Sequence, residues 1–111
     1  MTSETESMLR RFREACLEVQ GGSLRWCCGH VACAVAGMFG GKIVAGRVNG
    51  EPHYWNRLDC GTEVDLTSCQ YGGDGFTPLS HGRARKTPTP IPIEFLVFAM
   101  AVSKHLAARE A

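Results

Sequence analysis

The sequence has no hydrophobic run long enough to cross a membrane, no large charge surplus and no internal repeat. No stretch reaches the roughly 18–20 consecutive apolar residues that a membrane-spanning helix needs. Residues 1–7 are acidic and polar and no apolar run follows them, which is unlike a secretory signal. The 111 residues suit one small domain. We therefore expect a single domain over residues 1–111 that is cytoplasmic and has no membrane partner.

The charge balance and the cysteines bear on the possible partners of the chain and on the state of its thiols. Lys and Arg number 12 and Asp and Glu number 11, so the net charge argues neither for nor against a nucleic-acid partner, and we expect none. Six cysteines in a short chain would suit a disulfide framework. However, a secretory signal is lacking, Cys27 and Cys28 are adjacent, and the hydrophobic content of 44% is high for a disulfide-stapled mini-fold. We therefore expect free thiols, metal ligands or a nucleophile.

Helical periodicity appears in three segments. Residues 8–20 place apolar side chains at steps of three and four, after a frayed tail at 1–7. Residues 28–39 are small and apolar nearly all round, which predicts a buried helix closed by Gly40 and Gly41. Residues 94–109 predict a final amphipathic helix.

Between the last two helices the pattern predicts a small sheet. Residues 42–48, 53–58 and 63–67 are expected to be strands, and Asn49-Gly50 is a hairpin turn signal. Residues 68–92 carry most of the prolines and are expected to be an irregular loop. The expected fold class is α+β, with N-terminal helices packed on a small antiparallel sheet.

The loop between the second and third strands sets which side chains meet. If it has three residues, Leu58 faces Thr62, and Gly61 suits a left-handed loop position. Asp65 then lies diagonal to His53, within side-chain reach. A two-residue loop would flip the parity and separate the two groups.

A thiol, an imidazole and a carboxylate in this order are typical of a cysteine acyl-transfer site. Cys28 at a helix start gains from the helix dipole and from a protonated His53, and both lower a thiol pKa. Asp65 would orient the imidazole. We expect Cys28 to be the nucleophile, His53 the general base and then acid, and Asp65 the orienting group.

The motifs around these residues resemble a known family. His53-Tyr54-Trp55 followed by Val64-Asp65-Leu66-Thr67 is similar to the His-x-Trp and Asp-x-Thr pair of transglutaminase-like proteins. With Trp26-x-Cys28, Gly40-Gly41-Lys42-Ile43 and Asp65-Leu66-Thr67-Ser68-x-Gln70-Tyr71, residues 24–72 more closely resemble the small bacterial YunG-like proteins. The resemblance implies a papain/transglutaminase-like core with Cys28, His53 and Asp65 at the catalytic positions.

The sequence departs from that pattern before the cysteine, where Trp26 and Cys27 replace Gly-Gln. Gln20 is a distant candidate for the missing oxyanion donor, and the backbone N–H of Cys28 is a better one. Trp26, Trp55 and Asn56 are further candidates for substrate contact, although Trp55 also suits the core and Asn56 a solvent-facing strand position. The expected substrate is a protein or small amide, without a cofactor. Peptidase, amidase, deamidase and transglutaminase chemistry all stay open, and no oligomeric state is predicted.

Two alternatives to an enzyme remain. Cys27, Cys28, His30 and Cys33 are dense enough to suggest zinc, with Cys60 and Cys69 in reserve, although zinc knuckles usually lie in loops. The other alternative is a non-enzymatic interaction or inhibitor protein, such as a phage accessory factor, with residues 68–92 as its binding surface. The basic residues Arg83, Arg85 and Lys86 in this stretch suit either a partner contact or a solvated loop.

Overall fold

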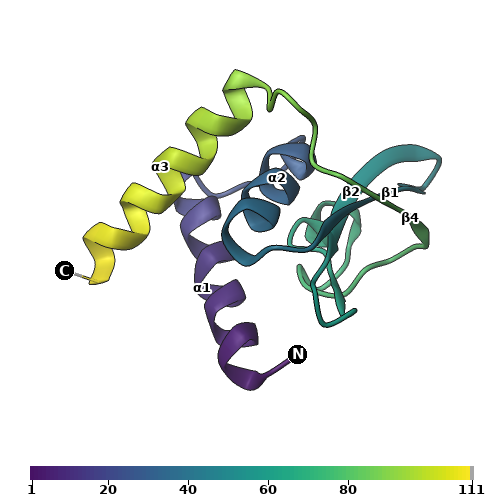
Figure 1. Cartoon of the computed structure of the whole chain (residues 1–111), viewed down its shortest axis with the longest axis horizontal. Coiled ribbons are helices and arrows are strands. Elements are labelled where there is room, and N and C mark those ends of the chain that lie inside the picture. Colours follow the sequence, from purple (N-terminus) through teal and green to yellow (C-terminus); the bar gives the residue numbers. More distant parts are fainter. Residues whose placement is uncertain (111) are drawn as a thin grey trace.

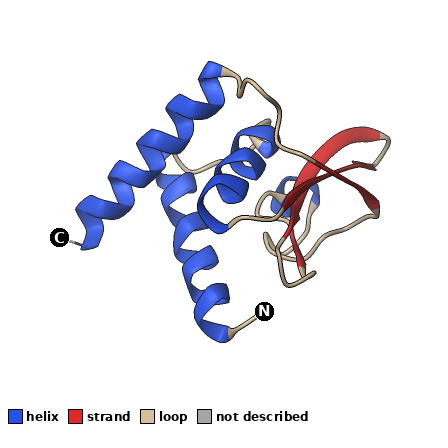
Figure 2. Ribbon diagram, in the orientation of Figure 1, coloured by secondary structure: helices blue, strands red, loops and turns tan. Residues whose placement is uncertain are grey.

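The computed structural model describes residues 1–110 and has an α+β fold (Figures 1 and 2). Residue 111, the last position of the expected domain, lies outside the described residues. No helix among residues 1–110 has the length and apolar character to cross a membrane. In chain order the elements are α1 (Ser3–Val19), α2 (Cys28–Phe39), β1 (Lys42–Val48), β2 (Glu51–Arg57), β3 (Glu63–Val64), the 3-10 helix η1 (Ser68–Tyr71), β4 (Gly82–Arg85) and α3 (Ile93–Glu110).

The three α-helices gather on one side of the molecule and the antiparallel sheet lies on the other (Figure 2). The strand order is β3-β2-β1-β4, so the β1–β2 hairpin is central. α2 lies between α3 and that hairpin, which makes it the innermost helix (Figure 1). The expected helices on a small antiparallel sheet are therefore confirmed at this level.

The core explains why α2 is apolar nearly all round. Val31 and Val35 of α2 are buried together with Leu9 and Phe12 of α1 and Val102 of α3. Because α2 is covered on several sides, a polar face would carry a desolvation cost there. The predicted bounds of this helix, 28–39, are confirmed.

α1 is longer than its apolar pattern predicts. It begins at Ser3, so the expected frayed tail at 1–7 is wrong for residues 3–7. The side chain of Thr2 accepts a hydrogen bond from Thr5 N at 3.1 Å and caps the helix. Glu4 and Glu6 in the first turn complement the helix dipole. Capping and charge therefore extend the helix beyond its buried stripe.

The register between β2 and β3 follows the three-residue loop. Asn56 pairs with Val64 and Leu58 N donates to Thr62 O at 2.9 Å, while Gly61 has φ +92°. The predicted parity is confirmed. β3 ends at Val64 rather than at residue 67, because Asp65 N leaves the ladder and donates to Phe76 O at 2.8 Å.

The stretch 68–92 is more regular than expected. It contains η1 and the edge strand β4, whose Ala84 pairs with Val44 of β1. The sequence signal for β4 is weak because the strand has only four residues and lies between turn residues. All six cysteines are free, as expected for a chain without a disulfide framework.

Candidate active site

Cys28 is the first residue of α2, and Cys27 occupies the capping position before it. The first N–H groups of a helix have no partner within the helix and stabilise nearby negative charge. The start of α2 is held against the sheet because Asn56 donates its side-chain Nδ2 to Ala32 O at 2.9 Å. The thiol of Cys28 is therefore fixed relative to β2, which carries His53.

His53 and Asp65 form a buried pair. Nε2 of His53 lies 2.7 Å from Oδ2 of Asp65, and the two side chains are 0% and 1% exposed. The other carboxylate oxygen accepts from Thr67 N at 3.1 Å and from Thr67 Oγ1 at 3.2 Å. Thr67 thus orients the carboxylate, which gives the Asp-x-Thr motif a physical role.

Two aromatic rings hold the imidazole in place. The His53 ring centroid lies 5.7 Å from that of Trp55 and 5.0 Å from that of Tyr71, with Tyr71 edge-on. Trp55 comes from the same strand and Tyr71 from the end of η1. With Asp65 at Nε2, these contacts leave Nδ1 as the ring nitrogen available to another group.

The thiol of Cys28 is the ionisable group that interacts with the imidazole of His53, in addition to Asp65. Burial raises the pKa of the Cys28 thiol, but the His53 side chain and the backbone at Tyr54 lower it more, so its pKa lies below 9.0. Burial lowers the pKa of His53, whereas Asp65 and Cys28 raise it, to about 9. Nδ1 makes no aligned hydrogen bond. Such loose geometry is common in catalytic sites without substrate.

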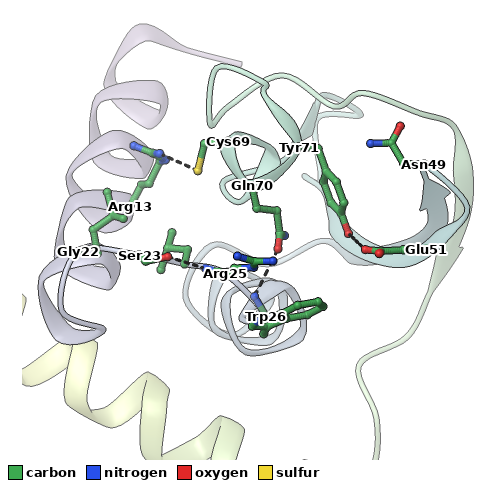
Figure 3. A pocket seen from close by; sticks show the side chains of 12 residues that line it. Arg13, Gly22, Ser23, Arg25, Trp26, Asn49, Glu51, Cys69, Gln70 and Tyr71 are labelled. Carbon is green, nitrogen blue, oxygen red and sulfur yellow. Dashed lines mark hydrogen bonds between the residues drawn. The ribbon is translucent and has the colours of Figure 1, made fainter.

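A polar cleft of about 670 Å³ opens beside this site (Figure 3). Tyr71, which contacts His53, lines the cleft and donates its hydroxyl to Glu51 at 3.3 Å. Burial raises the pKa of Tyr71, and Glu51 and, less strongly, Cys28 add to the shift. Tyr71 therefore connects the cleft to the imidazole that it contacts, while neither Cys28 nor His53 is among the residues that line the cleft.

Gln70 points across this cleft toward the chain before α2 (Figure 3). Its Oε1 accepts from Trp26 N at 3.4 Å, which leaves Nε2 as the free end of the amide. Nε2 is buried and has no hydrogen-bond partner. Within the described chain, only His53 Nδ1 shares this condition among side-chain nitrogens and oxygens. Two unpaired polar atoms thus flank the segment that carries Cys28.

The residues proposed for substrate contact differ in their exposure and in their position relative to the cleft. Trp26 lines the cleft and is 72% exposed, so its position suits contact with a substrate. Trp55 and Asn56 are buried at 1% and 2%, and Trp55 Nε1 donates to Glu63 at 2.7 Å. Gln20 caps the end of α1 and does not line the cleft. Neither buried residue nor Gln20 is therefore placed to contact a substrate.

Sequence reasoning did not assign a role to Gln70. The residue belongs to the Asp65–Tyr71 motif, and this membership was the only feature of the sequence that pointed to a functional role for it. The contact that positions it spans 44 residues, from Trp26 to Gln70, and has no local periodicity that a sequence pattern would reveal.

The cysteines and the histidine proposed as zinc ligands do not form a cluster that could bind a metal ion. Nowhere in residues 1–110 do three His, Cys, Asp or Glu side chains come together in a way that would hold a metal ion. His30 instead packs its ring 4.5 Å from that of Phe95 and 5.7 Å from that of Phe98. The zinc alternative has no geometric support in this part of the chain.

A family model described as YunG protein matches residues 21–106. The match covers well over half of the chain and includes Cys28, His53, Asp65 and Gln70. Searches of curated proteins and of solved structures gave no match.

Proposed function

The chain belongs to the YunG family, and we propose that its domain is a cysteine-dependent acyl-transfer enzyme with a Cys28–His53–Asp65 triad. The observation that carries the proposal is one buried imidazole bonded to a carboxylate at 2.7 Å and coupled to a thiol at a helix start. A papain/transglutaminase-like core is part of the same proposal, supported by the order of a helix-borne cysteine, a strand-borne His and an Asp that directly follows β3.

The first step forms a thioester on Cys28. Because His53 lowers the pKa of the Cys28 thiol while Asp65 and Cys28 raise that of the imidazole to about 9, the reacting form is the one in which Cys28 is a thiolate and His53 carries the proton. The thiolate attacks the carbonyl carbon of an amide or ester, and a C–S bond forms. The bond from that carbon to the leaving nitrogen or oxygen then breaks, and His53 gives its proton to the leaving group.

The second step releases the acyl group. His53, now neutral, takes a proton from water or from an incoming amine, which attacks the thioester and expels the Cys28 thiolate. Asp65 keeps the ring in the required tautomer and stabilises its protonated form in both steps. Hydrolysis gives peptidase, amidase or deamidase activity, and transfer to an amine gives transglutaminase activity.

The negative charge that develops on the carbonyl oxygen needs donors. The N–H of Cys28 at the start of α2 is one, since the first helical N–H groups have no partner within the helix. Gln70 Nε2 is the second donor of the proposal, because it is buried and unpaired and because Oε1 of the same amide lies 3.4 Å from Trp26 N, two residues before Cys28. The 3.4 Å bond is long and weak, so the amide can turn toward a bound carbonyl.

Thiol alkylation tests the nucleophile. Cys60 is exposed and hydrogen bonding from Thr62 lowers its pKa to about 7, so a Cys60→Ser, Cys69→Ser background is required. We expect iodoacetamide to label one site rapidly at pH 7, with the site located by peptide mass mapping. The fast phase is lost in Cys28→Ser and retained in Cys27→Ser, since burial raises the pKa of Cys27.

Dependence on the imidazole completes this test. His53→Gln should slow Cys28 labelling by about tenfold or more, because each unit of pKa changes the thiolate fraction tenfold. Labelling of Cys28 at the rate of the urea-unfolded chain, or labelling indifferent to His53, removes the enzymatic proposal. The interaction-protein alternative would then stand.

Acylation by p-nitrophenyl acetate tests the oxyanion donor. Gln70→Ala should slow single-turnover acylation of Cys28 by about 100-fold or more, without changing alkylation by iodoacetamide, which develops no oxyanion. The matched control is Gln20→Ala, the other glutamine of the chain, which should leave both rates unchanged. Equal acylation rates in the two variants would remove Gln70 from the mechanism.

A further inference from the structure

A second cavity, of about 310 Å³, lies between α2, the sheet and the chain that enters α3. Its size is at the lower end of the range for small-molecule sites and holds roughly ten waters. The segment that leaves β4 runs past α2 to the start of α3 and closes one side (Figure 1). The lining residues are Gly29, Ala32, Cys33, Ile43, Tyr54, Arg85, Lys86, Pro88 and Phe95.

The walls of this cavity are apolar. Ala32 and Cys33 come from α2, Ile43 from β1 and Phe95 from α3. Burial raises the pKa of Cys33, so its thiol stays neutral and behaves as a small apolar group. A cavity of this composition is suited to a compact apolar group rather than to a polar chain.

The mouth of the cavity is basic. Arg85 and Lys86 are both exposed, and no carboxylate lines the cavity beside them. Neither forms an ion pair with any group in residues 1–110. Two uncompensated cations at the rim of an apolar cavity favour a ligand that joins an apolar body to an anionic end.

The cavity adjoins the reactive thiol through two lining residues. Gly29 follows Cys28 directly in α2. Tyr54, which follows His53 in β2, lines the cavity, and its backbone interacts with the Cys28 thiol. The polar cleft at Trp26 and Tyr71 and this apolar cavity are therefore separate spaces that both reach the segment bearing Cys28.

We propose that this cavity is a binding subsite for a compact apolar group that carries a carboxylate, with the apolar part between Ile43 and Phe95 and the carboxylate at Arg85 and Lys86. Its position as a substrate subsite depends on the function proposed for Cys28, whereas its binding of the ligand does not. The basic residues at the end of β4 thereby gain a role in selecting the substrate.

Binding is measured with 4-phenylbutyrate and the uncharged 4-phenylbutan-1-ol, by isothermal titration calorimetry on the Cys28→Ser chain. We expect the carboxylate to bind about fivefold more tightly or better at low salt, with the preference falling as salt rises. The double variant Arg85→Gln, Lys86→Gln should abolish that preference and leave binding of the alcohol unchanged. The matched control Arg83→Gln, on the same strand but outside the lining, should keep the preference.

Two results would overturn the site: equal affinity for the charged and uncharged probes, or no binding of either at millimolar concentration.

A second experiment, protection of Cys28 from alkylation by the bound ligand, links the site to the thiol. In the Cys60→Ser, Cys69→Ser background, saturating 4-phenylbutyrate should slow iodoacetamide labelling of Cys28. Charge-selective binding without protection would refute the subsite and leave the proposed function intact. Charge-selective binding to a chain whose Cys28 is unreactive would refute the proposed function and leave the binding site.

Discussion

His53 is the residue on which the site depends, because its two ring nitrogens have different surroundings. Nε2 is bonded to Asp65, whereas Nδ1 is buried without an aligned partner. Asp65 is itself fixed by Thr67, so the ring has one orientation and one available nitrogen. The interaction with Cys28 then lowers the pKa of the thiol and adds to the raised pKa of the imidazole.

Replacing the carboxylate should weaken this coupling. In Asp65→Asn the charge that raises the pKa of His53 is lost, so the pKa of His53 falls and that of Cys28 rises toward 9.0. We expect the midpoint of the pH–alkylation profile to move upward and the rate at pH 7 to fall by about tenfold. Asp59→Asn, in the exposed loop after β2, is the matched control. An unmoved midpoint in Asp65→Asn would show that the carboxylate does not act on the thiol.

At the scale of the elements, contacts between α2 and the sheet fix the distance from Cys28 to His53. Asn56 joins β2 to the backbone of α2 at Ala32. Gly46 on β1 lets Trp55 approach the strand, since an added Cβ would lie 2.5 Å from the Trp55 ring. Both residues therefore position the site without contacting the reacting groups.

Removal of the Asn56 contact should cost stability. Asn56→Ala loses a buried hydrogen bond and leaves a space, so we expect the free energy of unfolding to fall by about 1–3 kcal/mol, measured by urea denaturation. Asn49→Gly is the control: Asn49 is exposed with φ +52°, which glycine adopts readily, and the change should stay within about 0.5 kcal/mol. A loss for Asn56→Ala no larger than that of the control would mean that the hydrogen bond does not hold the elements together.

Substitution by alanine at two glycines should change the stability of the chain in opposite directions. Gly46→Ala places a methyl group against Trp55 and 2.7 Å from His81 O, and overpacking of this kind costs about 1–3 kcal/mol. Gly37→Ala lies in the exposed interior of α2 with open space around it, so it should stabilise by roughly 0.5–1 kcal/mol. Thermal melting compares the two, and a Gly46→Ala chain as stable as the original would show that Trp55 can move freely.

For the whole molecule, the site makes stability depend on pH in an unusual way. In the folded chain the imidazole keeps its proton up to about pH 9, and the thiol has a pKa below 9.0. Between pH 6.5 and pH 9.0, the unperturbed pKa values of the two groups, the unfolded pair holds one proton, on the thiol. Stability changes with pH only where the two states bind different numbers of protons. The folded pair also holds one proton from the pKa of its thiol up to about pH 9, so the pair should add little slope there; below that range, stability should fall as the pH rises above 6.5.

Cys28→Ser removes that balance. The pKa of His53 is still raised by Asp65, so its contribution is fully present below pH 6.5 and is lost as pH rises through its folded pKa. We expect the free energy of unfolding of Cys28→Ser, relative to the unchanged chain, to decline from pH 6 to pH 9, measured by urea denaturation under reducing conditions. Parallel pH profiles would mean that the thiol and imidazole do not share a proton.

The fold was predictable where neighbouring residues decide the structure. A run of small apolar residues closed by Gly40 and Gly41 predicted the bounds of α2, and Gly61 together with the spacing of Leu58 and Thr62 predicted the β2–β3 register. That register carries His53 and Asp65 to the same place, because side chains alternate strictly along paired strands. The start of α1 and the strand β4 were missed because a cap and an edge strand depend on few residues.

The sequence alone determined the helix that carries Cys28, the strand that carries His53 and the parity that brings Asp65 toward His53, because residue patterns and loop parity act over a few positions. Only the tertiary structure decided which groups surround them. The contact of Gln70 with Trp26, that of Asn56 with Ala32, and the closure of the cavity by Phe95 join segments far apart in the chain. These contacts follow from how the core packs α2 between the sheet and α3, which no local pattern encodes.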